Sequence, residues 1–330
     1  MIPLSVLDLA PLPDGSNAGQ ALHNAADLAR LAERLGYRRF WMAEHHSMPG
    51  IASAATAVAL AYVGAQTKTI RIGAGGIMLP NHAPLVIAEQ FGTLESLFPG
   101  RVDLGLGRAP GTDRATAAAL RRGLASDENQ FPQEVLELIG YLRGEAGHVR
   151  AIPGEGLRIP VWILGSSLFG AQLAAMLGLP YAFASHFAPA QMMSAVRVYR
   201  ERFQPSDQLD RPYVMLGFNV IAAATDADAQ LLATSVQQAF INLRSGRPTQ
   251  LPRPLPGFED GLTAEARGLL HQVLACSAIG GPARVRAAMA EFAASTGADE
   301  LMITSQIHDH QARLRSFEIA MDAALTMQAD

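Results

Sequence analysis

An acid and two histidines end the apolar part of the stretch FWMAEHHSMPG, Phe40 to Gly50. Three titratable side chains, Glu44, His45 and His46, thus gather where a buried strand would finish, just before a Pro-Gly pair. Alternation along a strand sends His45 to one side and the other two to the opposite side. Histidine exchanges protons near neutral pH, so His45 is the stronger candidate for proton transfer, or His46 if the strand ends earlier. At least one of the three is expected to be structural.

Histidines and acids can also bind a metal, and a second group of this kind, His308, Asp309 and His310, lies near the end of the chain. A metal site needs several ligands that converge on one point. The apolar run that opens the chain offers only Asp8 and has no HxH pattern. Asp309 is typical of an acid in the first turn of a helix. We therefore predict no metal site.

Two further stretches combine residue types that bind phosphate. GLGRAPGTD, Gly105 to Asp113, joins flexible backbone to Arg108, whose guanidinium can hold a phosphate through paired hydrogen bonds. GSS places Ser166 and Ser167 at the start of a helix, where free N–H groups and the helix dipole favour an anion. Alone, each has an ordinary explanation as a surface ion pair or a helix cap. Together they predict a phosphate-binding corner.

A glycine-rich stretch, GAGG, ends another apolar run. Gly75 and Gly76 could simply permit a bend in a strand, or their bare backbone could let a flat ring lie against it. The stretch lacks the GxGxxG spacing of a dinucleotide site, and the chain shows neither a Walker loop nor a G-x-S-x-G nucleophile elbow.

The elements that would position these residues are short apolar runs that alternate with helical segments, several of which end at a glycine such as Gly36 or Gly178. The runs are continuously apolar, as in a parallel sheet buried on both faces. Polar or glycine-rich residues follow most of them, Ser185 included, and this edge carries the active site in a barrel. We predict an α/β fold, a (β/α)8 barrel, with an open doubly wound sheet as the alternative. The expected strands are Leu4–Leu9, Arg39–Glu44, Ile70–Gly75, Val102–Gly107, Val161–Gly165, Tyr181–Ala184, Val214–Ala222 and Leu301–Thr304.

Two passages are longer than the connections that a minimal (β/α)8 barrel needs. The passage after the fourth strand is expected to hold a helix from Phe131 to Leu142 and a turn-rich return. The passage before the eighth strand contains a Pro- and Gly-rich segment, Leu243 to Leu262, that we predict to be a mobile lid. No linker divides the chain, so residues 1–330 are expected to form one domain.

Composition argues against several classes of protein. The net charge is −4 and no block of like charges occurs, which disfavours nucleic-acid binding and a polybasic membrane surface. One cysteine, Cys276, excludes a disulfide within the chain and a four-cysteine zinc site. Neither a signal peptide nor a membrane-spanning run of apolar residues is visible, so the protein is expected to be cytoplasmic.

Four stretches, in order, resemble the bacterial luciferase-like family of flavin-dependent monooxygenases. The fourth resembles the closing helix of the subgroup that carries the GRAPG signature. The four stretches are LGYRRFWMAEHHSMPGIAS, IRIGAGGIMLPNHAPLVIAEQFGTLESLFPGRVDLGLGRAPGTD, LGSSLFGAQLAAMLGLPYAFASHF and LMITSQIHDHQARLRSFEI.

The resemblance implies a (β/α)8 barrel, usually dimeric, that uses reduced FMN. It implies that Arg108 and the helix start at Ser166 and Ser167 hold the flavin phosphate. The isoalloxazine ring would lie against Gly75 and Gly76, where relatives often have a non-proline cis peptide.

His45 matches the family histidine proposed to handle protons near the flavin C4a position, and Ser185 is counted among the candidate cofactor-binding residues. The chain departs from the family at two points. Leu168–Gly170 occupy the position where luciferase itself could offer a hydroxyl, and Gly107 replaces a family cysteine.

The predicted activity is that of a monooxygenase that uses reduced FMN, supplied by a separate flavin reductase, and O2 as cosubstrate. It would oxidise a small, apolar organic substrate through a C4a-(hydro)peroxyflavin; Trp41, Met78 and Phe187 are the expected apolar lining. One alternative is an F420-dependent oxidoreductase of the same barrel family, against which GRAPG argues. The other is a flavin-binding protein without turnover, which the intact EHH disfavours.

Overall fold

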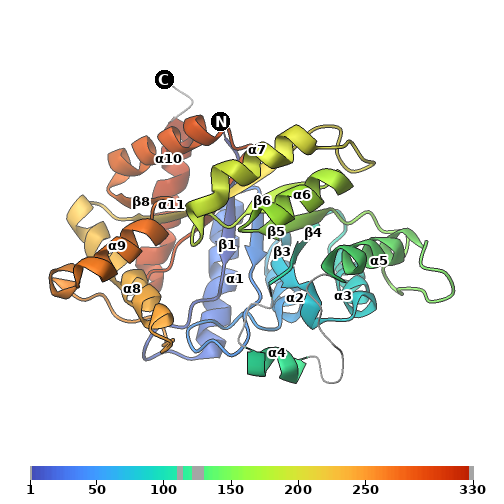
Figure 1. The fold of residues 1–330 in the computed structure, drawn as a ribbon. Coiled ribbons are helices and arrows are strands. Elements are labelled where there is room, and N and C mark those ends of the chain that lie inside the picture. The colour runs from blue at the N-terminus through green and yellow to red at the C-terminus, as the bar shows by residue number, and fades with distance from the viewer. Residues whose placement is uncertain (1, 110–113, 121–129, 327–330) are drawn as a thin grey trace.

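The computed structural model describes residues 2–109, 114–120 and 130–326. Parallel strands alternate with helices, and the hydrogen-bonded order β6-β5-β4-β3-β2-β1-β9-β7 is closed by the pairing of β6 with β7 (Figure 1). The predicted (β/α)8 barrel is confirmed, and the open sheet is excluded. The barrel strands are β1 (Leu4–Asp8), β2 (Arg39–Met42), β3 (Arg71–Met78), β4 (Val102–Gly107), β5 (Val161–Gly165), β6 (Tyr181–Phe183), β7 (Val214–Ala222) and β9 (Glu300–Thr304).

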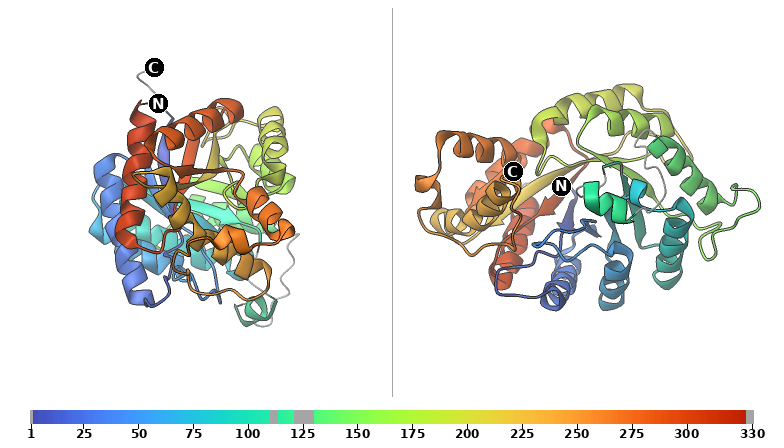
Figure 2. Two further views of the ribbon diagram at one scale, coloured as in Figure 1. Left: turned by 90° about the vertical axis from the view of Figure 1, so that its left-hand side faces the viewer. Right: turned by 60° about the horizontal axis from the view of Figure 1, so that its bottom comes forward.

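The helices surround the strands (Figure 2). Gly36 and Gly178 take the left-handed conformation that ends the first and sixth of them, at φ 85° and 62°. No helix in the described part of the chain is long and apolar enough to cross a membrane. The helices are α1 (Ala18–Leu35), α2 (Thr56–Gln66), α3 (Pro84–Leu97), α4 (Arg114–Leu120), α5 (Phe131–Arg143), α6 (Leu168–Leu177), α7 (Met192–Arg202), α8 (Asp226–Arg244), α9 (Ala264–Val273), α10 (Pro282–Thr296) and α11 (His310–Thr326).

The passage between β7 and β9 contains more secondary structure than the sequence indicated. It contains α8, α9, α10 and a ninth strand, β8 (Ser277–Gly280), that was not predicted. β8 pairs with the second half of β7, Asn219–Ala222, whereas β6 pairs with the first half, Val214–Leu216. β8 was missed because its four residues, SAIG, are too few to show a period, and its place depends on the length of a distant strand.

The predicted lid segment is partly helical. α8 continues to Arg244, and residues 245–257 then run without regular structure apart from a bridge at Leu251. The backbone of Leu251 donates to the carbonyl of Leu12 and accepts from the N–H of Asp14, each at 2.9 Å. The segment is thus tied to the loop after β1. Its mobility remains a prediction.

A buried ion network fills the barrel at the amino ends of the strands. Arg39 donates from Nε to Oε1 of Glu300 and from Nη1 to Oδ2 of Asp103, both at 2.8 Å, and its guanidinium lies 4.8 Å from the ring centroid of Trp162. Burial alone would lower the pKa of Arg39, but Asp103 and Glu300 outweigh it and raise that pKa. Trp41 Nε1 also donates to Asp103, at 3.1 Å. The network therefore connects β2, β4 and β9.

An apolar layer covers this network on the side of the carboxyl ends. It packs residues from six barrel strands and forms the floor on which any ligand at the barrel mouth would rest. Its buried members are Leu7, Trp41, Ala43, Trp162, Ala182, Met215 and Met302.

Replacement of Arg39 by methionine should destabilise the protein strongly, because Asp103 and Glu300 would stay buried without their cation. We expect a loss of about 3–5 kcal/mol in the free energy of unfolding, measured by urea denaturation. The neighbouring Arg38 is exposed, and its Nη1 donates to the Tyr213 hydroxyl at 2.9 Å. Arg38→Met should therefore cost less than about 1 kcal/mol. Equal losses in the two variants would contradict the assigned role of the network.

Candidate active site

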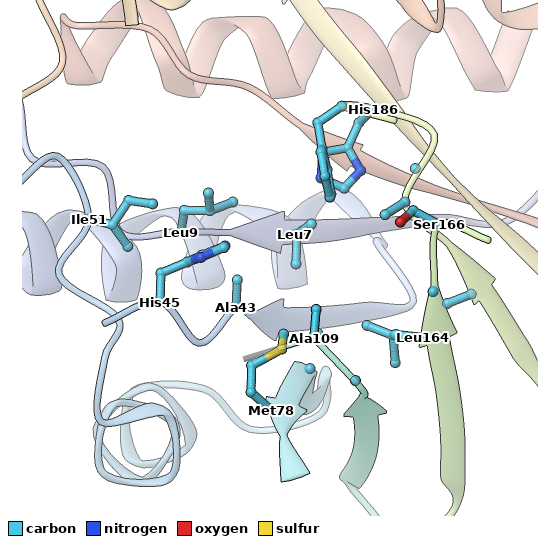
Figure 3. Close-up of a pocket in the computed structure, with 18 of the residues that line it drawn as sticks. Leu7, Leu9, Ala43, His45, Ile51, Met78, Ala109, Leu164, Ser166 and His186 are labelled. Atoms are coloured by element: carbon cyan, nitrogen blue, oxygen red, sulfur yellow. The ribbon is translucent and has the colours of Figure 1, made fainter. Parts of the chain in front are cut away.

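A cavity of about 480 Å³ opens at the carboxyl ends of the barrel strands. All eight barrel strands, or the residues just after them, contribute to its lining, and its size suits a cofactor or a drug-sized ligand. Figure 3 shows part of the lining, with His45 and His186 on different sides of the space. The predicted apolar residues Trp41, Met78 and Phe187 belong to it.

His45 is half-buried and lines the cavity three residues after the end of β2. Glu44 is buried away from it, as alternation predicted. Its Oε1 accepts hydrogen bonds from Nε2 of His46 and Nε2 of His82, each at 2.8 Å, and its Oε2 accepts from the N–H of Met78 at 3.1 Å. Glu44 thus joins the ends of β2 and β3, which is a structural role of the kind expected for at least one of the three residues.

The surroundings of Glu44 keep it ionised. Burial alone would raise its pKa, but the hydrogen bonds from His82 and His46 outweigh burial and lower the pKa below its usual value. An ionised carboxylate only accepts, so both histidines must carry a proton on Nε2. The ligand atoms of these three residues lie within 4.8 Å of one another, a spacing that could hold a metal ion. Direct hydrogen bonds already satisfy the carboxylate, so the geometry does not require a metal.

The two predicted phosphate-binding stretches meet at one corner of the cavity. Arg108, Ser166 and Ser167 all line it. The guanidinium of Arg108 lies 4.2 Å from the ring centroid of Phe169 in the first turn of α6, which holds the cation beside the helix start. Ser167 is the N-cap of α6, yet its hydroxyl makes no capping hydrogen bond. The donor set therefore fits a phosphate group. The rest of the predicted loop, Pro110–Asp113, lies outside the described residues.

The backbone of Gly75 and Gly76 forms a bare part of the cavity wall, and the peptide bond between them is cis, as the resemblance implied. A Cβ on Gly75 would lie 2.7 Å from Cδ1 of Leu7, and a Cβ on Gly76 would lie 2.8 Å from the carbonyl of Gly105. Pairing of β3 with β4 is irregular at this point. The site therefore combines the bend and the bare surface that the sequence left as alternatives.

Ser185 has a different environment from the one expected. It is fully buried and does not line the cavity, and its hydroxyl donates to the carbonyl of Gly217 at 2.6 Å. This geometry gives no support to a contact with a cofactor, because the next residue, His186, reaches the cavity instead. In a short strand end, the sequence could not show which of two neighbouring polar residues faces inward.

The apolar wall opposite the phosphate corner was predicted only in part, because the expected lid, Leu243 to Leu262, did not include the residues of α8 before Leu243. It comes from α8 and the segment after it, through Val236, Phe240, Leu243 and Leu251. The only sequence signal for this wall was the Pro- and Gly-rich composition after Leu243.

The HDH stretch does not converge on the cavity. His308 contacts the carbonyl of Asp14 at 3.1 Å, and His310 contacts Asp27 at 2.9 Å. Asp309 caps α11 by accepting from the N–H of Ala312 at 2.7 Å. None of these three side chains lines the cavity. These contacts support the reading of Asp309 as an ordinary residue of a helix start.

Comparisons with known proteins agree with this geometry. Residues 2–300 match a family model described as luciferase-like monooxygenase. A "Luciferase-like monooxygenase" of Escherichia coli (strain K12) is 54% identical over 323 residues, 97% of this chain and 96% of the relative. An "N-acetyl-S-alkylcysteine monooxygenase" of Bacillus subtilis (strain 168) is 33% identical over 255 residues, 75% of each chain. The solved structure of apo-MsnO8 has a TM-score of 0.88 at 34% identity and covers 98% of both chains.

Two more distant structures share the fold alone. The oxygenating constituent of 3,6-diketocamphane monooxygenase of Pseudomonas putida, in complex with FMN, has a TM-score of 0.70 at 16% identity and covers 96% of both chains. An F420-dependent secondary alcohol dehydrogenase has a TM-score of 0.71 at 13% identity and covers 98% of both chains.

Replacement of Glu44 by glutamine should reduce stability in a pH-dependent way. The pKa of Glu44 is lower in the folded chain than the ordinary pKa of a glutamate, so the ionised carboxylate stabilises the fold above that ordinary value. This contribution is lost as the pH falls through the lowered pKa. We expect Glu44→Gln to cost about 1–3 kcal/mol near neutral pH, in urea unfolding, and less in acid. The exposed Glu145→Gln is the control, and a Glu44→Gln loss that does not change with pH would contradict the assignment.

Proposed function

Because this chain belongs to the luciferase-like monooxygenase family, we propose that it is a monooxygenase that uses reduced FMN and O2 to oxidise a small, apolar organic substrate. Reduced FMN, when bound, supplies the electrons that activate O2. The observation that carries the proposal is a single cavity that joins a phosphate-fitting corner, a bare glycine wall and a histidine.

The phosphate corner would bind the cofactor by two kinds of donor. Arg108 supplies a charged fork, and the start of α6 supplies backbone N–H groups and the positive end of the helix dipole. The hydroxyls of Ser166 and Ser167 lie at the same corner. Because Phe169 holds the guanidinium, Arg108 would lose little conformational freedom when the phosphate binds.

His45 would move a proton at a ligand in the cavity. It extends from the end of β2, whose position Glu44 fixes through its bonds to β3 and to His82. The proposed division is therefore that His45 performs chemistry while Glu44 and His46 hold the strand end. A histidine held in this way can give or accept a proton without a large rearrangement.

The apolar wall of the cavity supports an apolar substrate. Val236, Phe240 and Leu251 would pack against alkyl or aryl groups and would exclude water from the reaction. One relative carries the name of a monooxygenase that acts on an S-alkyl compound, and an S-alkyl group has the chemistry this wall would accept. Alkyl sulfides are therefore the first substrates to test.

The quaternary structure proposed is a homodimer that buries one face of α2. This helix contains no charged residue, yet Val58 and Tyr62 are exposed on it at 72% and 37%. On the adjacent α3, Val86 and Leu97 are exposed as well. A second copy of the chain would cover this face.

Sedimentation should give twice the chain mass of 35.1 kDa, and Val58→Asp should shift the equilibrium to monomer. A native protein that sediments as a monomer would contradict the proposal.

The partner proposed for turnover is a separate flavin reductase in the cytoplasm, since the cavity has one phosphate corner and no dinucleotide motif lies beside it in the described residues.

Titration of the protein with FMN and with F420 distinguishes the proposed cofactor from the one used by distant barrels of the same fold. Tighter binding of F420 than of FMN would overturn the choice of cofactor.

Replacement of Arg108 by glutamine should weaken FMN binding by about 10- to 100-fold, the loss of one charged hydrogen-bonding group. Riboflavin lacks the phosphate, so its dissociation constant should not change. Both constants can be measured by quenching of flavin fluorescence. The exposed Arg150→Gln is the control. Equal losses for the two flavins would contradict a phosphate contact.

Replacement of His45 by alanine should reduce turnover by about 10²- to 10⁴-fold and leave the FMN dissociation constant within about twofold. Turnover is measured as oxygen consumption and sulfoxide formation with a flavin reductase and an alkyl sulfide. The exposed His271→Ala should behave like the native protein. Undiminished turnover in His45→Ala would show that another group handles the proton.

A further inference from the structure

His186 is a second histidine of the cavity, and nothing in the proposed chemistry uses it. It lies three residues after the end of β6 and lines the cavity. In Figure 3 its side chain lies on a different side of the space from His45, and Ser166 lines the same cavity. Around the barrel, the polar lining residues therefore follow one another from Arg108 after β4, through Ser166 and Ser167 after β5, to His186 after β6.

The imidazole of His186 is held in place by its neighbours. Its ring meets the ring of Phe187 edge-on, with centroids 5.1 Å apart. Its backbone carbonyl accepts a hydrogen bond from Nδ2 of Asn219 at 2.5 Å. On β7, a Cβ at Gly217 would lie only 2.2 Å from Nδ1, so the ring can rest against this strand only because residue 217 is glycine. The space between Gly217 and Phe187 therefore accommodates the imidazole ring closely.

Despite this close packing, Nδ1 of His186 is buried and has no hydrogen-bond partner among the described residues. Buried polar atoms are normally paired, and an unpaired one costs about 1–3 kcal/mol. The ring lines a ligand cavity, so a bound molecule can supply the partner. Because Nδ1 faces Gly217, a ligand in the cavity would bond Nε2 directly, or would bond Nδ1 after a half-turn about the Cβ–Cγ bond that exchanges Nδ1 with Cδ2.

The surroundings of His186 also select the kind of group it would bind. Burial, with a smaller effect from His45, lowers its pKa to about 4. The ring is therefore neutral near pH 7, with one nitrogen that donates and one that accepts. This suits hydroxyl, carbonyl or ring N–H groups better than a phosphate, for which Arg108 is present at the neighbouring corner.

We propose that His186 is a cofactor-binding residue that hydrogen-bonds the neutral part of the flavin, its ribityl chain or its isoalloxazine ring. The inference rests on the proposed function, which makes the ligand a flavin. The proposal assigns to the cofactor the side of the cavity lined by the residues that follow β4, β5 and β6. The wall formed by α8 and residues 245–257 is then left for the substrate.

The test compares His186→Phe, which keeps a flat ring against Gly217, with His186→Gln, which restores a donor and an acceptor. Dissociation constants for FMN, riboflavin and lumiflavin are measured by fluorescence titration, and thermal unfolding confirms that each variant folds. We expect His186→Phe to weaken FMN and riboflavin alike, by about 2- to 12-fold, and His186→Gln to recover most of the loss. The exposed His271→Phe should change neither constant.

Lumiflavin, which lacks the ribityl chain, locates the contact. A loss that persists with lumiflavin supports a bond to the ring, and one that disappears supports a bond to the chain. If the native protein binds FMN and His186→Phe binds it equally well, the assignment of His186 is wrong while the proposed function stands. If the native protein binds no flavin, both are wrong.

Discussion

The guanidinium of Arg39, buried between the carboxylates of Asp103 and Glu300, is the interaction on which the rest of the barrel depends. It ties three strands together at their amino ends, where a parallel barrel has no hairpins to fix the strands in register. Asp103 also holds the indole of Trp41, which belongs to the floor of the cavity. Trp41 thus links the charged network at the amino ends of the strands to the floor of the ligand site, as a member of the apolar layer between them.

The carboxyl ends of the strands are held in a different way. There Glu44 gathers donors from two histidines and one backbone N–H, so that a single buried carboxylate fixes the ends of β2 and β3. Glycines at 75 and 76 then leave the wall bare, and Phe169 keeps Arg108 at the start of α6. These contacts order the polar groups of the site before any ligand binds, which reduces the entropy that binding must overcome.

The division of the cavity follows from the topology of the barrel. β7 is long enough to pair with β6 in its first half and with β8 in its second. In the same passage of the chain α8 lines the cavity, and the two backbone hydrogen bonds between Leu251 and the loop after β1 hold the segment after α8 on that side. The opposite side, after β4, β5 and β6, keeps arginine, serine and histidine. The proposal of a polar cofactor beside an apolar substrate rests on this contrast between the two sides of one cavity.

Much of this was determined by the sequence alone. Continuous apolar runs, glycine-terminated helices and polar residues after each run specify a parallel barrel and the edge that carries its site, because the carboxyl ends of parallel strands meet at one face. By this rule, His45, Gly75, Arg108, Ser166 and Ser167 could be placed together from sequence. Only the tertiary structure decided that His186 rather than Ser185 faces the cavity, that His82 bonds Glu44 from 38 residues away, and that β8 extends β7. These choices depend on packing between distant segments, which leaves no local period in the sequence.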